Sequence, residues 1–182
     1  MRRRASQNIF LVAVGLLFVA GCYRAGPLVS EEGSYFNRGV AYGRRGQLDR
    51  AIVNFNRVLE INPTVAYAYY NRGFAHLQKG NYDQAIADNS KALEINPKIT
   101  LAYVNRGNAY LGKGQYDQAM ADYNKALEID PKNHAAYEGR ASVRKKKGDK
   151  EGAVLDLQKA YEYESDPRGR TRIQKLLQEV LN

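Results

Sequence analysis

The chain repeats a pattern of residue types every 34 positions. The tripeptide Asn-Arg-Gly occurs at 37–39, at 71–73 and again at 105–107. Three further series keep the same spacing: Gly46, Gly80, Gly114 and Gly148; Ala51, Ala85, Ala119 and Ala153; Pro63, Pro97 and Pro131. A fixed period of this length indicates small structural units that must stack on one another, because none can bury its apolar face alone.

Each unit carries signals for the ends of two helices. A glycine suits the left-handed backbone that closes a first helix. An acidic residue three positions later suits the positive end of a second helix, and a proline ends that helix because the residue before proline resists helical backbone. We therefore predict an all-α chain with one helix pair per unit. The acidic residues are Asp49, Asp83, Asp117 and Glu151.

An aromatic residue followed by Gly, Ala and Pro at fixed offsets of this period resembles the tetratricopeptide repeat. The resemblance implies a right-handed α-solenoid of about four helix pairs, and the units fall at 32–65, 66–99, 100–133 and a degenerate 134–167. Residues 168–182 are predicted to form an amphipathic capping helix, with a membrane-surface or dimerising helix as the alternative. Its apolar face comprises Ile173, Leu176, Leu177 and Val180.

In this family the first helices line a concave groove, so the resemblance implies a peptide-binding face there. Its central feature would be a ladder of amides, because an amide can pair with both backbone groups of an extended peptide. The alternative is that asparagine is only a soluble filler, and the ladder breaks at Gly139. The predicted groove residues are Asn37, Asn71, Asn105, Phe36, Tyr67, Tyr70, Phe74, Leu101, Val104 and Asn108.

The arginine of the tripeptide recurs in all four units, and an acidic residue follows sixteen positions later in three of them. We expect an ion pair between the two helices of those units, and a ligand contact is the alternative. The arginines are Arg38, Arg72, Arg106 and Arg140, and the residues sixteen positions on are Asn54, Asp88, Asp122 and Asp156.

The first residues resemble a bacterial lipoprotein signal. Three arginines precede an uncharged apolar run over 9–20, which is too short to cross a bilayer. Val19 to Cys22 then resembles the lipobox, so we expect residues 1–21 to be removed and Cys22 to be acylated. Residues 22–31 would be a short tether. By resemblance to enterobacterial sorting rules, Tyr23 favours the outer membrane, facing the periplasm, in a bacterium that has two membranes; otherwise the anchor would lie at the outer face of the plasma membrane. An ordinary signal peptide or an uncleaved anchor is the alternative.

The sequence points away from catalysis. Neither histidine lies in a set with metal-ligand spacing, and no nucleophile or phosphate-binding loop is recognisable, so no enzyme activity, metal or cofactor is expected. His76 is predicted to pack inside its unit and His134 to face solvent. Nucleic acid is not an expected partner of an exported chain. A basic run is either a solvated helix end or a patch for an acidic partner, and comprises Arg144, Lys145, Lys146 and Lys147.

These patterns favour a lipid-anchored scaffold or adaptor of the cell envelope that binds a protein or peptide segment. The layout is similar to that of pilotins, which help a secretin ring assemble, and to that of adaptors for peptidoglycan hydrolases. A self-associating structural protein with an empty groove is the alternative. A chaperone partner is not expected, because Leu101 and Asn105 stand where the carboxylate-clamp repeats would carry bases.

Overall fold

The computed structural model describes residues 30–182, and predictions that concern residues 1–29 lie outside this part of the chain. Within it the backbone forms nine α-helices and no strand. Their bounds are α1 Glu31–Arg44, α2 Leu48–Ile61, α3 Ala66–Gln78, α4 Tyr82–Ile95, α5 Thr100–Gly112, α6 Tyr116–Ile129, α7 His134–Lys146, α8 Lys150–Tyr163 and α9 Pro167–Leu181. Each of the ranges 32–65, 66–99, 100–133 and 134–167 holds one helix pair apart from the residues at its edges.

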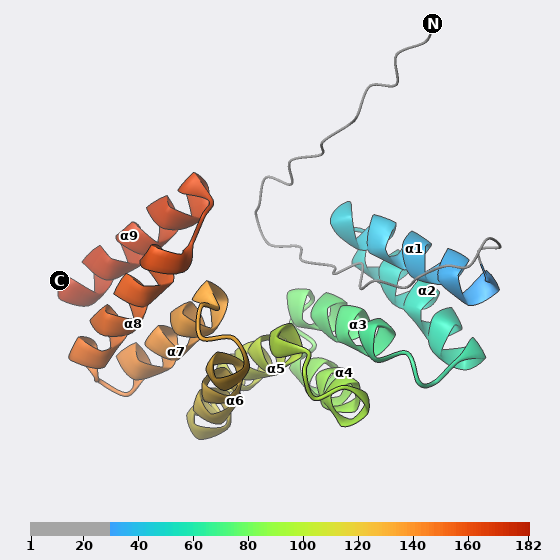
Figure 1. Ribbon diagram of the computed structural model, residues 1–182, viewed down its shortest axis with the longest axis horizontal. Helices are drawn as coiled ribbons and strands as arrows, with labels where there is room; N and C mark the ends of the chain where they lie inside the picture. The colour runs from blue at the N-terminus through green and yellow to red at the C-terminus, as the bar shows by residue number, and fades with distance from the viewer. Residues whose placement is uncertain (1–29) are drawn as a thin grey trace, which may run out of the picture.

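The helix pairs stack side by side into an arc (Figure 1). The first helices of neighbouring units contact one another, since α1 meets α3, α3 meets α5, and α5 meets α7. The second helices of the described units make no comparable contacts with each other, because the arc bends toward the first helices. The predicted all-α repeat solenoid with an extra helix is confirmed.

Two series of glycines have the structural roles expected of them, one in the turns and one where two helices cross. The turn glycines lie in the left-handed region, with φ between 72° at Gly46 and 83° at Gly148, where residues with a side chain are strained. At Gly107, in the middle of a first helix, an added Cβ would lie 2.9 Å from the Tyr123 ring of the second helix. The glycine therefore allows the two helices of the unit to cross closely.

Helix α9 closes the C-terminal end of the stack. Ile173 and Val180 are buried against a cluster from α7 and α8 that includes Leu157, and Leu176 and Leu177 pack at its edge. The helix begins with Pro167, and the side chain of Asp166, directly before it, accepts a hydrogen bond from the Arg168 backbone N–H in the first turn. The apolar face predicted for this helix thus covers the last unit.

Candidate protein-binding groove

The inner face of the arc is built from α1, α3, α5 and α7. Several predicted groove residues on it are apolar and mostly buried, namely Phe36, Tyr70, Phe74 and Val104. Tyr67, Leu101 and Asn108 are partly exposed, and Asn37 is exposed. Tyr67 and Leu101 occupy the same position of successive units, so the accessible part of this face repeats along the arc.

The asparagine series does not present a uniform row of amides. Asn37 is exposed, whereas Asn71 is 0% and Asn105 is 6% exposed. The Asn71 amide donates to the Tyr67 carbonyl one turn earlier, at 2.8 Å. The Asn105 side chain lies in hydrogen-bonding contact with the Tyr70 hydroxyl, whose pKa is raised by burial. Two of the three amides therefore already make hydrogen bonds inside the protein. Their contact with a bound peptide is untested and stays a prediction.

Gly139 shows why this series ends in the fourth unit. A Cβ added at Gly139 would lie 2.3 Å from the ring of Tyr123, which belongs to the second helix of the unit before. Asn71 and Asn105 occupy the equivalent position of their own units. This position therefore packs against the preceding unit, and in the fourth unit a Cβ at Gly139 would clash with the Tyr123 ring as it stands.

The predicted ion pairs inside three units are confirmed. Arg106 holds Asp122 with two parallel bonds, Nε to Oδ2 at 2.8 Å and Nη2 to Oδ1 at 2.7 Å. Arg72 with Asp88 and Arg140 with Asp156 repeat the same geometry. The three carboxylates are 3–7% exposed, so these are buried, charge-assisted pairs rather than surface ones.

A third bond of each arginine was not predicted. Arg106 Nη1 donates to Ser90 Oγ at 3.0 Å, in the second helix of the preceding unit. Arg72 and Arg140 reach the equivalent residues Asn56 and Asn124 at 2.7 and 2.8 Å. The sequence held a signal for this contact, because the acceptors also lie 34 positions apart. Each arginine therefore joins three helices of two units.

Arg38 departs from this arrangement. Its own unit has Asn54 in place of the aspartate, and the Asn54 amide donates to the Arg50 carbonyl instead. The Arg38 guanidinium lies 4.3 Å from the centre of the Tyr35 ring and makes no ion pair with the described residues. The other three arginines also stack on the tyrosine three positions earlier, at 5.4–5.7 Å. Arg38 is thus the exposed member of a series whose other three arginines are partly buried.

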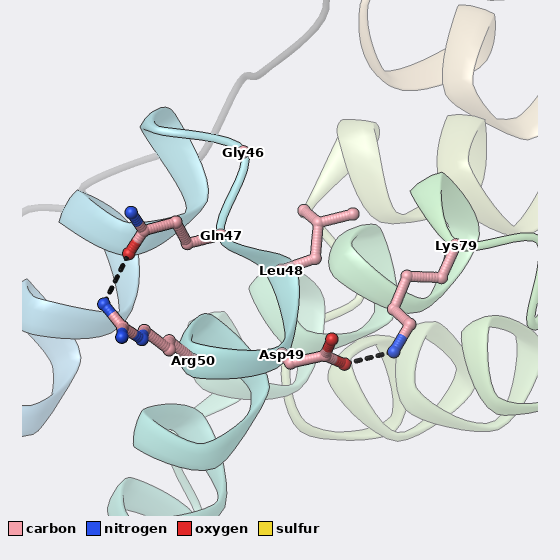
Figure 2. Close-up of a pocket in the computed structure, with 6 residues that line it drawn as sticks. All are labelled: Gly46, Gln47, Leu48, Asp49, Arg50 and Lys79. Carbon is pink, nitrogen blue, oxygen red and sulfur yellow. Dashed lines mark hydrogen bonds and ion pairs between the residues drawn. The ribbon is translucent and has the colours of Figure 1, made fainter.

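A shallow pocket lies on the edge of the arc, where α2 begins beside the end of α3. Figure 2 shows that Asp49 and Lys79 form an ion pair across it, while Arg50 donates to Gln47. The ion pair recurs as Lys113 with Asp83 and Lys147 with Asp117. Its carboxylates are largely exposed, so water and salt screen each pair and it adds little to stability. This pocket is a seam between units rather than part of the inner face.

The basic run at the end of α7 is largely paired within the chain. Arg144 lies 3.1 Å from Asp156, and Lys147 donates to Asp117 at 2.8 Å. Lys145 lies 3.7 Å from Glu179 of α9. Three of the four positive charges of the run are thus paired with carboxylates of the same chain. Binding of an acidic partner by this run stays a prediction.

The two histidines differ from each other. His76 is partly buried beside the Arg72–Asp88 pair, and burial lowers its pKa. His134, predicted to face solvent, has a side chain that is 34% exposed and that lies against two carboxylates, Glu138 and Glu164. The Glu138 carboxylate, together with Glu164, raises the pKa of His134. Glu164 lies 30 positions further along the chain, so no local spacing revealed this group.

No helix within residues 30–182 combines the length and the apolarity needed to cross a membrane. The signal-peptide prediction for 1–21, the acylation of Cys22 and most of the predicted tether concern residues outside the described part. The membrane anchor therefore stays a prediction from the sequence.

Comparison with known families agrees with the fold. The profile of the tetratricopeptide repeat matches residues 66–99 and 100–133, and a related repeat profile matches 39–80. The chain therefore belongs to the tetratricopeptide repeat family. Domains of this family generally mediate protein–protein interaction and are non-enzymatic scaffolds, as expected for this chain. No curated protein matches the sequence significantly.

Several solved structures are similar to the chain. The tetratricopeptide repeat domain of OM64 from Arabidopsis is 30% identical, with a TM-score of 0.61 over 63% of this chain and 94% of that domain. The crystal structure of MamA is 27% identical, with a TM-score of 0.68 over 73% and 78%. The second such domain of human RPAP3, in complex with the HSP70 peptide SGPTIEEVD, is 25% identical, with a TM-score of 0.59 over 61% and 92%.

Proposed function

We propose that the chain is a lipid-anchored scaffold of the bacterial cell envelope that binds an extended segment of a partner protein on its inner face. The observation that carries this proposal is the repetition of partly exposed apolar side chains, Tyr67 and Leu101, at one position of successive first helices. A segment that lies along the arc would meet the same kind of surface in the second and third units. The complex of the RPAP3 domain with an HSP70 peptide supports this use of the fold.

The chemistry of the inner face favours an apolar or neutral segment over an acidic one. Leu101 and Asn105 supply no positive charge, whereas Asn37 offers an exposed amide and Asn108 a partly exposed one whose oxygen accepts from the Tyr123 hydroxyl. The arginines of α3, α5 and α7 are already held by buried aspartates, so they are not available for a carboxylate of the ligand. Binding would therefore depend on apolar contacts and on hydrogen bonds to the peptide backbone.

Site-specific photocrosslinking tests where the partner binds. A photoreactive amino acid would replace Asn37, Tyr67 or Leu101 in separate variants, and Ala87 or Ala121 on the outward helices α4 and α6 in the controls. Ala87 and Ala121 are exposed, so the control positions are accessible. We expect crosslinked partner only from the inner positions, detected on blots of the cells that produce the chain. Crosslinks confined to the outward positions, or their absence everywhere, would contradict the proposal.

The anchor has its own test, because it rests on the residues before α1. Cys22 is the only cysteine of the chain, so Cys22→Ser removes the acceptor without touching the repeats. We expect the variant to leave the membrane fraction and to lose metabolic labelling by a palmitate analogue. Unchanged membrane association of Cys22→Ser would refute acylation as the anchor, and would leave the crosslinking test unaffected.

A further inference from the structure

A histidine and two carboxylates converge where α7 meets the connection between α8 and α9. His134 and Glu138 lie one turn apart on α7, and Glu164 follows the end of α8. One ligand atom of each residue lies within 4.8 Å of the other two. We propose that this group is a binding site for a divalent transition metal ion such as Zn²⁺, which would fasten the capping helix to the last unit.

The distances suit coordination better than a hydrogen bond. His134 Nδ1 lies 3.3 Å from Glu164 Oε2 and 3.5 Å from Glu138 Oε1. A charged N–H···O bond is shorter, at about 2.7–2.9 Å. Tetrahedral Zn²⁺ with bonds of about 2.1 Å separates neighbouring ligand atoms by about 3.4 Å. The buried Nδ1 atom makes no hydrogen bond with the described residues, so it is available as a ligand.

The surroundings of the two carboxylates hold them in place. Glu138 Oε1 accepts from Arg172 Nη2 at 2.8 Å, and Glu164 Oε1 accepts from the Asp166 backbone N–H at 2.9 Å. Such outer hydrogen bonds orient ligating carboxylates in metal sites. Glu138 Oε1 also faces His134. Because a carboxylate oxygen has two lone pairs, it can accept a hydrogen bond from Arg172 and bind an ion at the same time.

Burial and charge give a second argument. Glu164 is only 7% exposed, and buried carboxylates are normally paired with a cation or bound to a metal ion. Gly169 of α9 makes the room for it, because a Cβ there would lie 2.3 Å from Glu164 Oε2. With His134 neutral, the three ligands carry two negative charges, of which the one on Glu138 would be shared between the ion and Arg172. A fourth coordination position is left for water or for a side chain of a partner.

The nitrogen ligand sets the expected selectivity. An imidazole with two carboxylates suits Zn²⁺, Co²⁺ and Ni²⁺, whereas Mg²⁺ and Ca²⁺ prefer sites made of oxygen alone. The ion would join α7 to the α8–α9 connection, in addition to the apolar contacts of Ile173. We therefore expect bound Zn²⁺ to raise the thermal midpoint of the chain.

Titration calorimetry with ZnCl₂ tests the site. The protein would be the full chain without a polyhistidine tag, carrying Cys22→Ser to remove its only thiol, in mild detergent. We expect one Zn²⁺ per chain, and a four-coordinate absorption spectrum when Co²⁺ is used instead. His134→Ala and Glu164→Gln should each weaken binding at least tenfold, because each removes one of three ligands. His76→Ala, which changes the other histidine, should leave the affinity unchanged.

Circular dichroism would verify that each variant is folded before it is titrated. Glu164→Gln keeps the size of the side chain and keeps an oxygen that can accept from the Asp166 N–H. It therefore still tests the site if His134→Ala disturbs the fold of α7. The proposal is overturned if the folded parent chain binds no Zn²⁺ at concentrations up to 100-fold above that of the protein. It is also overturned if the folded His134→Ala and Glu164→Gln variants bind as tightly as the parent.

Discussion

Replacing Arg106 with alanine is expected to destabilise the folded chain by about 3–5 kcal/mol, because it leaves the buried Asp122 carboxylate without its cation. Asp122 is 5% exposed, so its carboxylate is poorly solvated and loses two charge-assisted bonds. The substitution also breaks the bond to Ser90 and so loosens the contact with the preceding unit. Urea denaturation followed by circular dichroism would measure the loss of free energy of unfolding.

Arg38→Ala is the matched control for Arg106→Ala. Arg38 is the same residue type at the same position of its unit, but it is exposed, lies over the Tyr35 ring and makes no ion pair with the described residues. Its replacement should change stability by no more than about 1 kcal/mol. The interpretation would be wrong if the two alanine variants unfolded at the same urea concentration. Replacing both partners of the buried pair by apolar residues should cost less than Arg106→Ala alone.

Introducing asparagine at Gly139 is expected to destabilise the chain, although it would continue the Asn series into the fourth unit. The Cβ and the amide would collide with the Tyr123 ring, which already lies 2.3 Å from the ideal Cβ position. Overpacking of this kind costs about 1–3 kcal/mol and sometimes more. The midpoint of thermal unfolding should therefore fall by several degrees.

A companion substitution separates the steric effect from helix propensity. Tyr123→Leu in the same chain should recover part of the stability lost by Gly139→Asn, because the smaller side chain vacates the space. Lys146→Asn, at an exposed position of α7, should leave the midpoint nearly unchanged. A Gly139→Asn variant as stable as the parent would show that this position is not packed against the preceding unit.

The sequence predicted correctly those structural features that depend on the position of a residue within its own unit. Gly46 and its equivalents predicted the turns, because a left-handed residue strongly favours glycine. Arg106 and Asp122 predicted an ion pair, because two series of opposite charge kept the same offset of sixteen residues. The apolar face of α9 predicted the cap, since Ile173 and its neighbours follow the helical period.

The sequence did not reveal the side-chain contacts that form between neighbouring units or between distant parts of the chain. Whether Asn105 faces the groove or the preceding unit depends on how far each pair is rotated against the next, and the 34-residue period is the same in both cases. The break at Gly139 looked like the end of a binding ladder, whereas the structure shows that Gly139 packs closely against the Tyr123 ring. His134 and Glu164 meet only because α8 returns the chain to the start of α7.

The arginine bonds also bear on how such a chain changes length during evolution. Arg106 bonds with its own unit and with the unit before it, and Arg72 and Arg140 use the same pattern. A duplicated copy of residues 66–99, inserted directly after the original, would offer every arginine the same acceptors as before. Gene duplication in steps of one unit would thus lengthen the inner face without leaving a buried charge unpaired.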